Sequence, residues 1–150
     1  MVRRAPFLRS PIVTDQPLHY RPATELAQLL KSGEISAVEV MRAFLTRIEE
    51  ANPKLNSIVS MLPESEALKL AEAADAKRAA GEPLGLLHGL PTAVKDLNHT
   101  VGFPTSFGSR AQDGEPMPTR DVEMVARIRK AGALIIGKTN TPSYGVGTLA

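Results

Sequence analysis

Two lysines in this sequence end short apolar stretches, where a basic side chain could meet a ligand. Lys138 ends the segment GALIIGK, and Thr139 completes the pattern G-x-x-x-x-G-K-[ST] of loops that bind nucleotide phosphates. Lys95 ends the segment GLPTAVK and is followed by Asp96. The first pattern would predict phosphate binding. The second would predict either an amine for acid–base chemistry or an ordinary ion pair with Asp96.

The residues around Lys138 argue against a phosphate loop. Such a loop follows a strand, forms a tight nest of backbone amides and opens a helix. Here a helical pattern over residues 121–131 precedes Gly132, and the four inner residues Ala-Leu-Ile-Ile are apolar and partly β-branched, which favours a buried strand. Pro142 follows where the helix would need its first turns. We therefore expect Gly132 to end a helix, a strand to end at Gly137, and no nucleotide to bind.

Lys95 is the candidate for chemistry. Its predicted strand, Thr92 to Val94, leads into an excursion over residues 98–120 that is rich in glycine and proline. A long irregular segment inside a compact domain is usually functional. The apolar side chain of Val94 and the start of this loop could leave the ammonium group half desolvated at a cleft. Desolvation disfavours the charged form of an amine, and a neutral amine is a competent general base.

The elements that would position Lys95 alternate between helix and strand. Helical periodicity with start and stop signals predicts four helices: 24–33 capped by Thr24, 36–53 opened by the capping box of Ser36 and Glu39, 64–80, and a helix capped by Asp121 that ends at Gly132. Apolar segments between breakers predict three strands: NSIVSML, Thr92 to Val94, and residues 133–136. This rhythm is typical of an α/β fold, with crossover helices on a largely parallel sheet.

The composition is that of an ordinary globular domain, and it argues against some classes of binding partner. Of 150 residues, 43% are hydrophobic and 23% charged, and no stretch approaches the roughly 20 apolar residues of a membrane-spanning helix. A net charge of +2 and 4% aromatic residues provide neither a basic groove nor stacking platforms, so we expect no direct contact with nucleic acid and none with a membrane.

The cysteine and histidine content limits the kinds of reactive or metal-binding site that the chain can contain. The sequence has no cysteine, which excludes disulfides and thiolate chemistry and fits the reducing cytoplasm, where we expect the protein to be located. His19, His88 and His99 lack the spacing of a metal pair, so no metal and no cofactor is predicted. Residues 1–21 begin with an arginine- and proline-rich segment and are expected to form a flexible N-terminal arm.

Two segments together, PLGLLHGLPTAVKDLNHTVGFPTSFGS and AGALIIGKTNTPSYGVG, closely resemble the amidase signature family, whose members hydrolyse or transfer carboxamides. The match extends from Pro22 to Ala150. It implies an α/β fold with a mixed, largely parallel β-sheet core flanked by helices, of which residues 22–150 would be the amino-terminal part. It also implies a small-molecule amide as substrate, and it leaves a homodimer of the full-length protein open.

The resemblance further implies a Ser-cisSer-Lys triad in which Lys95 matches the family lysine. A neutral lysine takes a proton from a serine on a cis peptide, and that serine relays a proton from the nucleophilic serine that attacks the amide carbonyl. Both serines belong to a Gly-Gly-Ser-Ser-Gly type segment that this sequence does not contain. Ser106, Ser109 and Ser143 lie outside that motif, and we expect their hydroxyl groups to bond nearby backbone in turns.

The loop after the second motif carries one match and one departure. Asn140 matches the family asparagine, and we expect its side chain to hold the loop through backbone hydrogen bonds, with lining of the substrate path as a second role. Ser143 stands where many relatives have glutamate. Two alternatives to a free amidase stay open: the A-type subunit of a tRNA-dependent amidotransferase, acting as a glutamine amidase, and a catalytically inert fragment or structural module that needs a partner.

Overall fold

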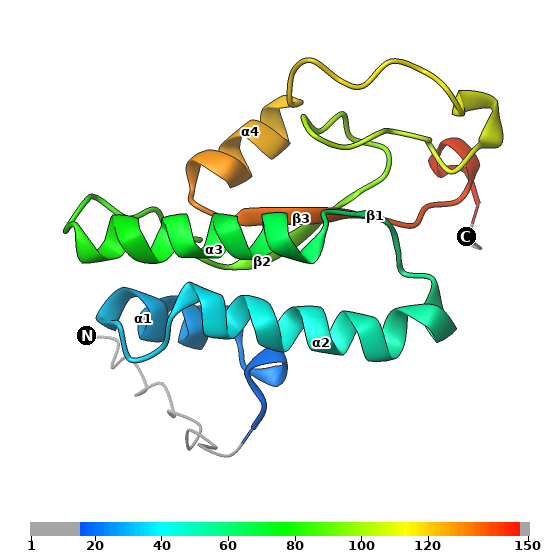
Figure 1. The fold of residues 1–150 in the computed structure, drawn as a ribbon. Helices are drawn as coiled ribbons and strands as arrows, with labels where there is room; N and C mark the ends of the chain where they lie inside the picture. The colour runs from blue at the N-terminus through cyan, green and yellow to red at the C-terminus, as the bar shows by residue number, and fades with distance from the viewer. Residues whose placement is uncertain (1–15, 148–150) are drawn as a thin grey trace, which may run out of the picture.

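The computed structural model describes residues 16–147; residues 1–15, most of the predicted arm, and residues 148–150 lie outside the described part. Helices and strands alternate along the chain, as the sequence predicts (Figure 1). The α-helices and strands are α1 (Ala23–Ser32), α2 (Ala37–Leu55), β1 (Ile58–Met61), α3 (Glu64–Ala79), β2 (Pro91–Lys95), α4 (Glu123–Lys130) and β3 (Leu134–Thr139). Three short 3-10 helices are Leu18–Tyr20, Arg110–Gln112 and Ser143–Gly145.

The three strands form one mixed sheet in the order β1-β3-β2. β2 and β3 run parallel, with Lys95 opposite Thr139, and β1 runs antiparallel to β3, with Met61 opposite Gly137. Because β2 and β3 are parallel, their carboxyl ends meet at the same edge of the sheet. The two segments that carry the family resemblance are thereby brought side by side.

Two apolar clusters lie on the two faces of the sheet. On one face, α1, α2 and α3 pack as a layer against Ile136 and Leu90 (Figure 1), with Val40, Met41 and Ala67 wholly buried. The small side chains of α3 allow close packing on α2. On the other face, Val125, Ile135, Val94 and Phe103 join α4 and the 98–108 loop to the sheet.

Helix α2 begins with the predicted capping box: the Glu39 amide donates to Ser36 Oγ at 3.1 Å, and the Ser36 amide donates to Glu39 Oε2 at 2.8 Å. The hydrogen bonds that the Ser36 amide and the Ser36 hydroxyl donate to the Glu39 carboxylate hold the pKa of that carboxyl below its ordinary value. Asp75 of α3 adds a cap from a distant segment, since its carboxylate accepts from the amides of Ala37 and Val38.

Three predicted helix boundaries are wrong. α1 begins before Thr24, with Pro22 as its N-cap and no side-chain capping bond, and α2 continues through Pro53 to Leu55, where Asn56 supplies the left-handed stop. Asp121 does not cap α4. The N-cap is Val122, because the Asp121 carboxylate is already engaged with the preceding loop and with Arg129.

Gly137 is not the end of its strand, because β3 continues through Lys138 to Thr139. Gly137 lies opposite both β1 and β2, and a Cβ there would come within 2.7 Å of the Ser60 carbonyl oxygen. The glycine is therefore needed for the close approach of β1.

The described remainder of the predicted arm, residues 16–21, is seated on the helical layer. Leu18 packs against the cluster around α2, and the Arg47 guanidinium lies 5.9 Å from the centre of the Tyr20 ring. In the part of the chain that the structure describes, no helix is long and apolar enough to cross a membrane.

Candidate functional site

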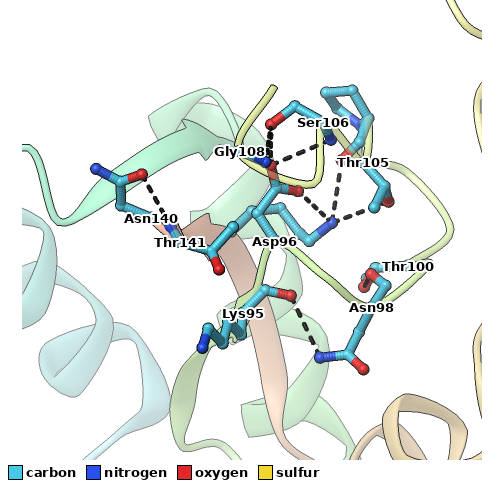
Figure 2. Close-up of polar contacts among 11 residues, drawn as sticks. Lys95, Asp96, Asn98, Thr100, Thr105, Ser106, Gly108, Asn140 and Thr141 are labelled. Carbon is cyan, nitrogen blue, oxygen red and sulfur yellow. Dashed lines mark hydrogen bonds and ion pairs between the residues drawn. The ribbon is translucent and has the colours of Figure 1, made fainter. Parts of the chain in front are cut away.

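Lys95 is the last residue of β2. Within the described part of the chain, residues 16–147, its side chain is exposed to solvent. Its carbonyl oxygen accepts from the Asn98 amide at 3.1 Å and from Asn98 Nδ2 at 3.3 Å, which closes the turn after the strand. The half-desolvated environment expected from Val94 and the loop is not provided by this part of the chain. The reason is side-chain alternation along the strand and into the residue after it: Val94 and Asp96 are buried and Lys95 between them is exposed. Figure 2 shows the side chains of Lys95 and Asp96 pointing to different sides.

Asp96 pairs with Lys138 rather than with Lys95. Lys138 Nζ lies 2.8 Å from Asp96 Oδ1, and the two side chains are 0% and 4% exposed. Nζ also donates to the Pro104 carbonyl oxygen at 3.0 Å and to Thr105 Oγ1 at 3.1 Å. All three donors of the ammonium group thus have partners, so the apparent phosphate-loop lysine is enclosed in protein and pairs with a carboxylate.

The other carboxylate oxygen of Asp96 holds the 104–108 turn. Asp96 Oδ2 accepts from the Ser106 amide at 3.1 Å and from the Ser106 hydroxyl, and Ser106 Oγ accepts from the Gly108 amide at 3.1 Å. The pair therefore joins the end of β2, the following loop and β3 (Figure 2). Ser106 combines the expected turn chemistry with a contact that the sequence did not predict.

A second loop, after β3, packs on the first. Asn140 behaves structurally as expected: its Nδ2 donates to the Asn56 carbonyl oxygen at 3.2 Å and its Oδ1 accepts from the Thr141 amide at 2.8 Å. Ser143 Oγ donates to the Gly108 carbonyl oxygen at 3.0 Å. A Cβ on Gly108, whose φ is +68°, would come within 2.4 Å of the Thr141 carbonyl oxygen, so the two loops are in backbone contact.

Aromatic rings line the same loop contact. Phe107 stacks on Tyr144 with ring centres 6.2 Å apart, and His99 meets the Phe107 ring edge-on at 5.5 Å. Phe107 and Tyr144 both have a backbone φ of +53°, in the left-handed region that residues other than glycine seldom adopt. Backbone strain of this kind often accompanies functional loops.

The far end of the 98–120 excursion is fastened to α4. Asp121 accepts from the Val101 amide at 2.7 Å and from Arg129 Nε at 2.8 Å. The hydrogen bond from the Arg129 guanidinium is the main reason that the pKa of the Asp121 carboxyl lies below its ordinary value.

Sequence reasoning singled out Lys95 and Asn140 as candidates and did not predict the Asp96–Lys138 pair. A usable signal was present, since a lysine inside an apolar strand must find a buried partner. Within residues 16–147, no three histidine or acidic side chains are grouped to hold a metal ion, and His88 instead lies with Nε2 3.1 Å from the Ala74 carbonyl oxygen.

The fold is a mixed α/β unit of the kind found in amide-bond hydrolases. The described chain is similar to the crystal structure of a bacterial aryl acylamidase that belongs to the amidase signature enzymes, with a TM-score of 0.77 and 32% sequence identity. The similarity covers 86% of this chain and 27% of that one.

The family model described as Amidase matches residues 39–150. The chain is 45% identical over 126 residues to the A-type subunit of the glutamyl-tRNA(Gln) amidotransferase of Salinispora arenicola, covering 84% of this chain and 25% of the relative. It is 39% identical over 133 residues to the acylamidase of Rhodococcus erythropolis, covering 89% and 28%. The chain belongs to the amidase signature family, and it spans about a quarter of the length of these relatives, over an amino-terminal part of the domain.

Proposed function

We propose that the full-length protein containing this chain hydrolyses a carboxamide C–N bond to a carboxylate and ammonia or an amine. The observation that supports this function is the placement of Lys95 at the edge of the sheet where the two family motifs meet. The Lys95 backbone is fixed by the pairing of β2 with β3 and by the hydrogen bond from the Asn98 amide. Relatives named acylamidase and indoleacetamide hydrolase act on amides, which is consistent with this reaction.

In the proposed mechanism, Lys95 in its neutral form is the base of a Ser-cisSer-Lys triad. It accepts a proton from the bridging serine, which accepts one from the nucleophilic serine as that oxygen bonds to the amide carbonyl carbon. The proton then passes back through the bridging serine to the amide nitrogen, the C–N bond breaks and loss of the amine leaves an acyl-enzyme, and water then releases the carboxylate and frees the serine. Both serines lie outside the present sequence, and Lys95 would meet them on its exposed side.

The test is Lys95→Ala in the full-length protein, with turnover of a panel of aryl and aliphatic amides as the readout. We expect kcat to fall by about three or more orders of magnitude with a circular dichroism spectrum unchanged from wild type. Lys69→Ala is the matched control, because Lys69 is an exposed lysine in the middle of α3. Turnover retained in Lys95→Ala would refute the assignment of the base.

A second candidate is the A-type subunit of a tRNA-dependent amidotransferase, which the 45% identity to such a protein favours. Its glutaminase activity would be specific for glutamine and would depend on partner subunits. The same amide panel separates the two functions: turnover of aryl amides by the isolated full-length chain supports the free amidase, and turnover of glutamine only beside partner subunits supports the amidotransferase.

The inert-fragment alternative concerns the 150-residue chain by itself. Because neither triad serine is in it, we expect no amide turnover from this chain alone, and measurable turnover would contradict the proposed mechanism. The proposal retains a cytoplasmic location, with which the absence of cysteine is compatible.

A further inference from the structure

The Asp96–Lys138 pair joins three chain segments immediately next to Lys95. Lys138 belongs to β3, Asp96 follows the last residue of β2, and the remaining partners, at residues 104–106, belong to the loop. The pair and its hydrogen bonds therefore fix the relative positions of these segments, which come from separate parts of the sequence.

A buried ion pair of this kind is a poor source of net stability. Two charges leave water, and replacing such a pair by apolar side chains of similar volume is often neutral or stabilising. The compensation here is geometric: Asp96 Oδ1 and Lys138 Nζ form an ion pair, and four hydrogen bonds from or to the two side chains set the directions of the remaining contacts. Such an arrangement is suited to holding one geometry.

The positions of these groups constrain Lys95 through the single peptide unit that joins Lys95 to Asp96. The Asp96 amide donates to the Thr139 carbonyl oxygen at 3.0 Å, and the Asp96 side chain is held by Lys138 and Ser106. Because neighbouring strand residues point to opposite sides, fixing the Asp96 side chain on the buried side fixes the direction in which Lys95 leaves the strand.

We propose that Asp96, Lys138, Thr105 and Ser106 are positioning residues that set the orientation of Lys95, an inference that rests on the proposed role of Lys95 as the triad base. Misplacement of a catalytic group by about 1 Å can cost two orders of magnitude in rate, so loosening this network lowers turnover without removing any reacting group.

The test compares two serine substitutions in the full-length protein. Ser106→Ala removes the hydroxyl contact to Asp96 but leaves the ion pair intact, so no buried charge is left alone. Ser109→Ala is the matched control from the same loop, because the Ser109 hydroxyl caps only the local Ala111 amide. Thr105→Val removes the hydroxyl that accepts from Nζ, and Thr105→Ser retains it.

We expect kcat to fall about tenfold in Ser106→Ala and in Thr105→Val with KM nearly unchanged, since the loss concerns the transition state and not binding. Ser109→Ala and Thr105→Ser should stay within about twofold of wild type. All rates are measured at a temperature at which circular dichroism shows each variant fully folded. An unchanged kcat in both Ser106→Ala and Thr105→Val overturns the positioning role.

A second readout does not depend on amide turnover. Acetic anhydride labels lysine amines, and mass spectrometry compares the labelling rate of Lys95 with that of Lys69 in the same molecule. We expect the ratio to change several-fold in Ser106→Ala and not in Ser109→Ala. A wild-type protein without amide turnover refutes the proposed function alone, and the labelling ratio then decides the inference: equal ratios in the two serine variants overturn it.

Discussion

Replacing Lys138 with methionine removes the charge that balances Asp96 inside the protein. Methionine has a similar length and no polar hydrogen, so the volume at this site is nearly kept while three donors are lost. The Asp96 side chain, 4% exposed, then keeps its bonds from Ser106 but has no opposite charge. The Thr105 hydroxyl and the Pro104 carbonyl oxygen each lose a donor.

The expected loss of stability follows from this count. Removing one partner of a buried ion pair leaves an uncompensated charge and costs about 3–5 kcal/mol. A second substitution, Asp96→Asn, removes that charge while its amide oxygen still accepts from Ser106. The double variant Asp96→Asn/Lys138→Met should therefore be more stable than Lys138→Met by about 1–3 kcal/mol.

The assay is urea unfolding of the full-length protein at neutral pH, followed by far-ultraviolet circular dichroism. Lys69→Met is the control, because this exposed lysine in α3 should change the free energy of unfolding by less than about 0.5 kcal/mol. A Lys138→Met variant that unfolds at the same urea concentration as Lys69→Met would refute the reasoning, and so would a double variant less stable than the single one.

Three further stability predictions use the same unfolding assay. Ser36→Ala removes half of the capping box with Glu39 and should cost about 0.5–1 kcal/mol, and a stability equal to wild type would contradict the cap. Because the pKa of Asp121 is lowered mainly by Arg129, its stabilisation is present above the ordinary carboxyl pKa and is lost as pH falls through the folded pKa. The stability difference between wild type and Asp121→Asn should therefore shrink from pH 7 to about pH 3, and a constant difference would contradict this linkage. Val125→Ala, at the fully buried position of α4, should cost about 2–3 kcal/mol, and a cost near zero would mean that α4 does not pack as described.

Local features of the fold could be predicted because their causes are local. The capping box of Ser36 and Glu39, the left-handed stop at Gly33 and the apolar strands between breakers depend on residues within a few positions of one another. The predicted cap of α4 failed because distant groups supplied the decisive contacts. Asp121 is taken by Arg129 and by the Val101 amide, and so it does not cap its helix.

The candidate site divides in the same way. The sequence by itself determined the alternating α/β elements, the absence of a phosphate loop at GALIIGKT and the family resemblance that singles out Lys95, since periodicity, breakers and motifs are written along the chain. Only the tertiary structure decided that Asp96 pairs with Lys138 and not with its neighbour Lys95. The physical reason is that strand alternation turns adjacent side chains to opposite sides, whereas the parallel pairing of β2 with β3 brings distant residues into one buried network.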